Sequence, residues 1–191
     1  MDENLVKIRH ARSEKDFPFL KLEDDEYVEF AFKRAKICYM LIFGAVAGGL
    51  AIILFAFLVV LLGQASIDAS GRNFMYILLV LLIIIGLIFG AVAVSVFKGN
   101  QMFVTNKHVI QLIVKSPLVK SVNIIDLPSV EDASFNKAGF LQAFFNYGTF
   151  RLSTVGDETT YTFPYSDISQ KDLNAVSKLI TTAKENLKKE D

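Results

Sequence analysis

The sequence has a single cysteine, Cys38, and only two histidines, His10 and His108, among its 191 residues. One cysteine excludes an internal disulfide, so the chain is not a disulfide-built secreted domain. The nitrogen and sulfur ligands that zinc prefers are scarce, and we expect no metal site. The sequence also lacks a phosphate-cradling glycine loop, a Gly-x-Ser-x-Gly motif and a Cys/His nucleophile pair. We therefore expect neither catalysis nor a cofactor.

Neither sign of charge is in excess, since 20 Lys and Arg residues balance 20 Asp and Glu residues. The balance also holds within the two polar parts of the chain. Residues 1–36 carry eight basic and nine acidic side chains, and residues 98–191 carry eleven and ten. A nucleic-acid-binding protein needs an excess of positive charge on one face. We therefore expect no nucleic acid among the partners.

Apolar residues make up 52% of the chain and gather in two uncharged runs, residues 37–63 and 74–97. The first run would extend roughly 40 Å as a helix, which is enough to cross a bilayer. The second run contains no Lys or Arg to oppose insertion. Its Leu, Ile, Val and Phe residues favour insertion into the bilayer by about 5 kcal/mol. The sequence thus predicts transmembrane helices at 37–63 and 74–97, joined by a short external loop at 64–73.

Basic residues flank the outer ends of both predicted spans. Lys33, Arg34 and Lys36 precede the first span, and Lys98 and Lys107 follow the second. The positive-inside rule assigns such flanks to the cytoplasm. We therefore predict a multi-pass protein of the cell (inner) membrane with both termini cytoplasmic. Its first 36 residues then form an N-terminal cytoplasmic segment.

Each predicted span contains two glycines four residues apart, Gly44 and Gly48 in the first and Gly86 and Gly90 in the second. Glycines at this spacing share a helix face and allow another backbone to approach closely. The other span of the same chain fits this role, and so does a second copy in a homo-oligomer. The spans contain no ionisable residue and no proline, which favours membrane anchors over transport helices.

The segment before the spans, residues 1–36, carries three signals. Its first part has mixed charge and predicts a mobile stretch that includes His10. The acidic run EDDE at 23–26 lacks the glycine and ligand spacing of an EF-hand loop, which predicts a solvated turn. The sequence VEFAF at 28–32 alternates apolar with polar or small residues. This alternation suits a strand, although an amphipathic helix fits nearly as well.

The residues after the spans, 100–188, change to the pattern of an α+β domain. Strands are predicted where β-branched and aromatic residues gather or alternate, at 102–105, 108–115, 118–127, 150–153 and 160–165, with a weaker strand at 129–135. The last two strands form an antiparallel hairpin around a turn near Gly156 and Asp157. From Asp167 onward the pattern is an amphipathic helix, and Ser169 with Asp172 resembles a capping box. The sequence predicts antiparallel strands closed by a C-terminal helix.

A shorter helical pattern interrupts these strands in the segment NKAGFLQAFFNYG. Its apolar side chains at Phe140, Leu141, Phe144 and Phe145 fall at helical spacing. The favoured interpretation is a short amphipathic helix that packs on a sheet. The alternative is that Phe140, Phe144 and Phe145 form a surface that contacts the membrane or a partner protein.

The segments LEDDEYVEFAFKRAK, FVTNKHVI, SVNIIDLPSVEDASF and NYGTFRLST surround the paired spans in an order that resembles a known family. It is that of the bacterial membrane proteins bearing a pleckstrin-homology-like domain. The resemblance covers most of the chain from Leu22 to Leu187. It implies a strongly bent antiparallel sheet capped by the last helix, a fold generally used to bind lipids or proteins. His108 stands where family members often have arginine, and we expect it to be an ordinary strand residue.

These observations predict a membrane α-helical hairpin joined to a pleckstrin-homology-like domain at residues 100–188, displayed at the cytoplasmic membrane surface. We expect a non-catalytic binding or assembly role. The expected partners are membrane lipid and either another membrane protein or a second copy. Lys115 and Lys120 flank the turn at Ser116 and Pro117 and are candidates for lipid-headgroup contact, unless this turn is simply solvated. The alternative function is an oligomeric two-span channel.

Overall fold

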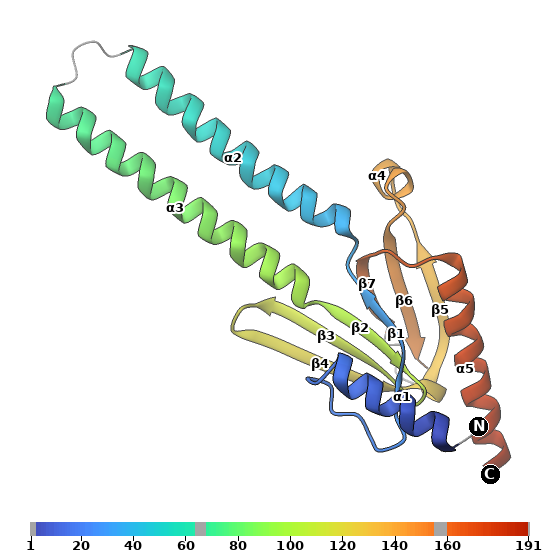
Figure 1. Cartoon of the computed structure of the whole chain (residues 1–191). Coiled ribbons are helices and arrows are strands. Elements are labelled where there is room, and N and C mark those ends of the chain that lie inside the picture. The colour runs from blue at the N-terminus through green and yellow to red at the C-terminus, as the bar shows by residue number, and fades with distance from the viewer. Residues whose placement is uncertain (1–2, 64–67, 155–159, 191) are drawn as a thin grey trace. The chain divides into compact units, whose positions relative to one another are not determined.

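The computed structural model describes residues 3–63, 68–154 and 160–190. The chain forms two compact units, whose elements are labelled in Figure 1. One unit runs from Lys36 to Phe97, and the other combines the residues up to Ala35 with those from Lys98 onward. The second unit is therefore built from both sides of the apolar segment. The sequence had instead suggested that residues 1–36 stand apart from a domain at 100–188.

The first unit is made by two helices, α2 at Lys36–Gly63 and α3 at Ala69–Gly99. Both are long and apolar enough to cross a bilayer. Helix α3 begins before the predicted residue 74, because Asp68 caps it by accepting a hydrogen bond from the Gly71 amide at 2.9 Å. Residues 64–67 of the predicted external loop lie outside the described residues.

The glycines of α2 and α3 lie in different surroundings. A Cβ added at Gly86 would lie 3.1 Å from Leu50 Cδ2, and one added at Gly90 would lie 3.1 Å from Val46 Cγ2. These two glycines therefore allow α3 to approach α2 closely. A Cβ added at Gly44 or Gly48 would meet no atom within 4 Å among the described residues. The α2 pair thus leaves a helix surface open.

The second unit contains a four-stranded antiparallel sheet in the order β1-β2-β3-β4. Its strands are β1 at Val28–Lys33, β2 at Gln101–Thr105, β3 at His108–Ser116 and β4 at Val119–Asp126. Strand β1 comes before the apolar helices and pairs with β2, which comes after them, with Lys33 opposite Gln101. The alternation at 28–32 therefore marks a strand and not a helix.

A second antiparallel sheet follows in the order β5-β6-β7. The short turn η1, Leu127–Ser129, leads into β5 at Val130–Asn136, and the sheet continues with β6 at Gly148–Thr154 and β7 at Thr160–Ser166. An isolated bridge between Arg34 and Ser166 links this sheet to the end of β1. The predicted turn near Gly156 and Asp157 lies outside the described residues.

The C-terminal helix α5, Gln170–Glu190, packs against β5 and η1. Its start is the predicted capping box, since the Ser169 amide donates to Asp172 and the Asp172 amide donates to Ser169 Oγ. One hydrophobic core joins the two sheets and α5, and its fully buried members include Met102, Val104, Phe150, Leu152 and Val176. Most alternating positions read from the sequence face this core, but Val28 packs in a second cluster and Tyr165 is exposed.

Residues before β1 form helix α1, Glu3–Asp16, instead of the predicted mobile stretch. The helix is held to β1 by polar contacts. The Val28 amide donates to Ser13 Oγ at 3.0 Å, and Arg9 lies 2.8 Å from Glu29. The prediction of mobility was wrong because mixed charge along α1 supplies these tertiary contacts, which composition alone does not reveal.

Helix α4, Phe140–Phe144, does not pack on a sheet as the favoured interpretation expected. Figure 1 shows it beyond the ends of β5 and β6. Its apolar side chains are largely exposed: Phe140 by 78%, Leu141 by 51% and Phe144 by 70%, with Phe145 at 40% just after the helix. Helical spacing identified the helix correctly. It does not show whether the apolar face of that helix packs on a sheet or remains exposed.

Candidate functional site

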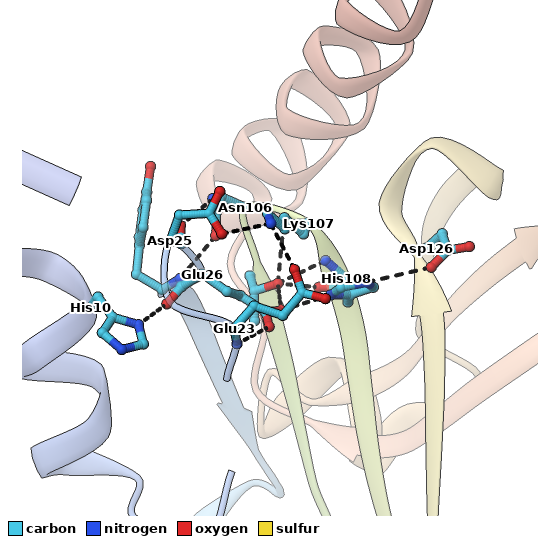
Figure 2. A network of polar contacts seen from close by, with 10 residues as sticks. His10, Glu23, Asp25, Glu26, Asn106, Lys107, His108 and Asp126 are labelled. Carbon is cyan, nitrogen blue, oxygen red and sulfur yellow. Dashed lines mark hydrogen bonds and ion pairs between the residues drawn. The ribbon is translucent and has the colours of Figure 1, made fainter. Parts of the chain in front are cut away.

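A polar network joins the loop before β1 to the turn between β2 and β3 (Figure 2). The two segments lie about 80 positions apart in the sequence and meet because β1 pairs with β2. The labelled members of the network are His10, Glu23, Asp25, Glu26, Asn106, Lys107, His108 and Asp126.

Glu26 is the centre of the network and is only 2% exposed. Its Oε1 accepts a hydrogen bond from Thr105 Oγ1 at 2.6 Å and lies 2.9 Å from His108 Nδ1. Its Oε2 accepts from the Glu23 amide at 3.2 Å. The prediction of a solvated acidic turn was therefore wrong for Glu26, although Glu23 and Asp25 are exposed.

The environment of Glu26 has opposing effects on the pKa of its carboxyl group. Burial on its own raises that pKa, because it penalises the charged form. The hydrogen bonds from Thr105 and His108 and the charge of His108 favour the carboxylate. Their combined effect wins, and the pKa of Glu26 lies below its ordinary value. The carboxylate is thus ionised at neutral pH within the protein.

Asn106 and Lys107 hold the same loop from the other side of the network. Asn106 Oδ1 accepts from the Tyr27 amide at 2.9 Å, and Asn106 Nδ2 donates to the Asp25 carbonyl at 3.1 Å. Lys107 Nζ lies 2.7 Å from Glu23 and 2.6 Å from Asp25. The hydrogen bonds that Lys107 donates to these two carboxylates raise its pKa well above its ordinary range, and the same bond to Asp25 lowers the pKa of that carboxyl group.

The two histidines take part in the network, which the sequence did not suggest. His10 Nδ1 lies 2.6 Å from the carbonyl oxygen of Glu26 and connects α1 to the loop. His108 lies between two carboxylates, since its Nε2 is 3.5 Å from Asp126 Oδ1. It opens β3, as expected, but it also fixes the buried carboxylate of Glu26.

A groove of about 590 Å³ lies beside the network. It is lined by residues of the β2-β3 turn and of the ends of β3 and β4, and by residues of α5. A groove of this size lies within the range of small-molecule sites in proteins. Its lining residues are Asn106, Lys107, His108, Asp126, Pro128, Ser129, Ala183, Asn186 and Leu187.

The chemistry of this groove suits recognition. It offers the Lys107 ammonium as a donor and the Asp126 carboxylate as an acceptor, next to apolar surface from Leu187. In residues 3–63, 68–154 and 160–190, no group of three or more His, Cys, Asp or Glu side chains is placed to hold a metal ion.

None of the site residues predicted from sequence lines this groove. Lys115 and Lys120 are exposed on β3 and β4 near the hairpin turn, where Lys120 pairs with Val114. Phe140, Phe144 and Phe145 cluster on and beside α4, and the four glycines lie in the helical unit. The predicted residues therefore form separate groups instead of one site.

Sequence reasoning missed Glu26, Thr105, Asn106 and Asp126. The contacts of Glu26, Thr105 and Asn106 span about 80 residues, so no local spacing connects them. Asp126 joins the network through His108. The available signal was the polar sequence TNKH between two apolar strands, which predicts a tight turn with side chains that bind backbone groups. Pairing that turn with the acidic run required knowledge that β1 joins the sheet.

Comparison of the chain with protein-family models, curated proteins and solved structures gives no match.

Proposed function

We propose that this protein is an integral membrane protein that displays a binding or assembly domain at the cytoplasmic face of the cell membrane. The pairing of β1 with β2 carries the proposal. The residues that precede α2 and the residues that follow α3 belong to the same compact unit. If each helix crosses the bilayer once, both connections emerge on the same side, as a single folded unit requires.

The charges at the helix ends support a cytoplasmic location for this unit. Lys33, Arg34 and Lys36 lie at the start of α2, and Lys98 lies at the end of α3. At the other ends of these helices, the positive charge of Arg72 is balanced by the negative charge of Asp68. Positive charge near membrane spans favours the cytoplasmic side, which makes both termini cytoplasmic.

The arrangement of strands supports a pleckstrin-homology-like fold for the domain. Four antiparallel strands are followed by three, and the helix after the last strand packs on them. This order matches the bent sheet with a closing helix that the family resemblance implies. We propose a non-catalytic role for the domain, because the groove presents a mixed polar and apolar lining suited to holding a ligand or a peptide segment.

The alternative function as a channel receives less support. The groove within the helical unit, about 310 Å³, is lined by apolar side chains, whereas an ion pathway needs polar groups or a wet lumen. Its lining residues are Ile53, Ala56, Phe57, Val60, Met75, Leu78, Leu79 and Leu82. Reproducible single-channel conductance of the purified protein in planar bilayers would favour the channel over a binding domain.

Cysteine labelling in intact cells tests the topology. In a Cys38→Ser background, we expect Ser70→Cys to react with an impermeant maleimide added outside. We expect Lys188→Cys to react only after the cells are permeabilised. The reverse pattern, or labelling of both positions from outside, would contradict the proposed orientation.

Photo-crosslinking tests the binding role of the groove. We expect a photoreactive amino acid at Asn186, on the α5 wall of the groove, to capture a discrete partner in membranes. The same amino acid at Lys178, an exposed α5 residue that does not line the groove, is the matched control. Equal crosslinking from both positions would remove the groove as the binding site.

A further inference from the structure

Helix α4 presents an aromatic cluster that the fold itself does not use. The rings of Phe140 and Phe144 stack at 5.8 Å, and those of Phe144 and Phe145 meet edge to face at 4.9 Å. Together with Leu141, these side chains form a continuous exposed apolar surface. Such a surface marks a place where another apolar phase or partner binds.

Contacts within the sheet-rich unit connect α4 to Ala35, the residue at which the chain leaves this unit. The Tyr147 amide donates to the Gln142 carbonyl of α4, and the Tyr147 ring lies 6.2 Å from that of Tyr165. The Tyr165 carbonyl accepts a hydrogen bond from the amide of Ala35, the residue that precedes α2. Tyr147 and Tyr165 therefore connect α4 to Ala35, where the chain leaves this unit.

The β3-β4 hairpin reaches the same end of the unit. Gln101, the first residue of β2, pairs with Leu112, and the hairpin continues beyond this pair to Ser116 opposite Val119. Its tip carries Leu118, which is 95% exposed. Gln101 also pairs with Lys33, so both chain connections to the apolar helices lie at this end.

Charge distinguishes this end of the unit from the opposite one. Exposed Lys115 and Lys120 lie at the hairpin tip, and exposed Lys137 follows β5 on the way to α4. Asp167 follows β7 at the same end. The acidic run at 23–26 precedes β1 and lies at the opposite end of the sheet. Basic side chains around exposed aromatic ones suit the interface of a bilayer that contains anionic lipid.

We propose that α4 and the tip of the β3-β4 hairpin contact the phospholipid bilayer, with the α4 phenylalanines inserted at the interface. The occupant is a lipid surface because both connections at this end lead directly into helices apolar enough to enter a bilayer. Aromatic residues favour the interfacial layer, and a shallow amphipathic contact of this kind adds to a membrane anchor. The inference rests on the proposed function, since it requires α2 and α3 to be in the membrane.

Quenching by brominated lipid tests the contact in the full chain. The protein carries Cys38→Ser and one bimane label, and it is reconstituted into vesicles of phosphatidylcholine and phosphatidylglycerol with bromines at shallow and deep positions. The test label is at Ala143→Cys, which keeps Leu141 and all the phenylalanines of the cluster. We expect quenching at least about twofold stronger than for Lys188→Cys on α5.

Two further measurements separate the possible failures. A label at Ile52→Cys, in the middle of α2, reports whether the apolar helices are in lipid. Unquenched Ile52→Cys would refute the proposed function. Quenched Ile52→Cys with Ala143→Cys no more quenched than Lys188→Cys would overturn the α4 contact alone.

A matched variant tests whether the aromatic side chains cause the contact. Adding Phe140→Ser and Phe144→Ser to the Ala143→Cys protein should reduce its quenching to the level of Lys188→Cys. These side chains are exposed, so we expect the variant to fold normally. Unchanged quenching in the variant would overturn the proposal. Bimane fluorescence at Ala143→Cys that changes when second copies of the protein are crosslinked, but not when brominated lipid is added, would also overturn it. That result would identify a protein partner at α4.

Discussion

Glu26 is a carboxylate enclosed by protein and held by three donors, from Thr105, His108 and the Glu23 amide. These donors come from both sides of the apolar helices in the sequence. Leaving a buried acceptor without its donor costs more folding free energy than a surface ion pair contributes. Glu26 therefore contributes to joining the N-terminal segment to the rest of the sheet-rich unit.

We expect Glu26→Gln to lower the free energy of unfolding of this unit by about 1–3 kcal/mol. A glutamine keeps one acceptor oxygen but replaces the other with an NH₂ donor, which would face donors from the protein. Pulse proteolysis of the full chain in detergent across a urea series measures the change. Asp24→Asn, an exposed acid in the same loop, is the control and should leave stability unchanged. Equal effects of the two substitutions would contradict the role of Glu26.

Acidification should weaken the same interaction. The pKa of Glu26 is lower in the folded protein than its ordinary value of 4.5, so protonation is harder in the folded state. The stabilisation is then complete above about pH 4.5 and is lost as pH falls through the lower folded-state pKa. We expect the stability of Glu26→Gln to fall less steeply than that of the wild type between pH 6 and pH 3, measured by the same proteolysis. Parallel pH profiles would contradict this expectation.

Single residues differ in how far the sequence predicted their environment. The alternating core residues, such as Phe150 and Leu152, followed from the period of two that a half-buried strand imposes. Glu26 did not, because an acidic run looks the same whether one of its members is solvated or buried. Its burial is decided by partners far away in sequence, and no local pattern encodes them.

At the scale of elements, the apolar helices pack through one glycine pair. Gly86 and Gly90 face Leu50 and Val46 of α2, whereas Gly44 and Gly48 face open space among the described residues. The glycine spacing predicted a packing face in each helix. It did not decide whether the partner is the other helix of the chain or a second copy. Contacts within the chain account for the α3 pair and leave the α2 pair for a second copy or for lipid.

We expect Gly90→Leu to destabilise the helical hairpin by about 1–3 kcal/mol, because the new side chain would displace Val46. Gly48→Leu is the matched control in α2 and should leave the stability of the hairpin unchanged. Unfolding in mixed detergent and SDS micelles, followed by circular dichroism, measures both. A larger effect of Gly48→Leu than of Gly90→Leu would contradict the packing described for α3.

The elements themselves were predictable to different degrees. Strands β2 to β4 and helix α5 have strong periodicity and a capping box, and the sequence located them. Helix α1 lacked an apolar stripe, so its charged sequence predicted mobility although tertiary contacts order it. The spacing of α4 was clear, but its surroundings were not, because a pattern of apolar residues does not specify what they face.

At the scale of the whole molecule, the sheet-rich unit is a domain with two apolar helices inserted between its first and second strands. We expect a chain of residues 98–191 alone to be unstable and prone to aggregation, since the edge of β2 and part of the core would be uncovered. A chain that joins residues 1–35 to 98–191 through a short Gly-Ser linker should be soluble and cooperatively folded. Gel filtration and thermal melts of the two chains compare them, and equal stability would contradict a structural role for β1.

The insertion also has a consequence for biogenesis. The ribosome makes β1 first and must complete both apolar helices before the strand that pairs with β1 appears. Were one helix to stay out of the bilayer, β1 and β2 would end on opposite sides and could not meet. If α2 and α3 cross the membrane as proposed, β1 can pair with β2 only after both helices have inserted, and a misinserted chain would expose an unpaired strand.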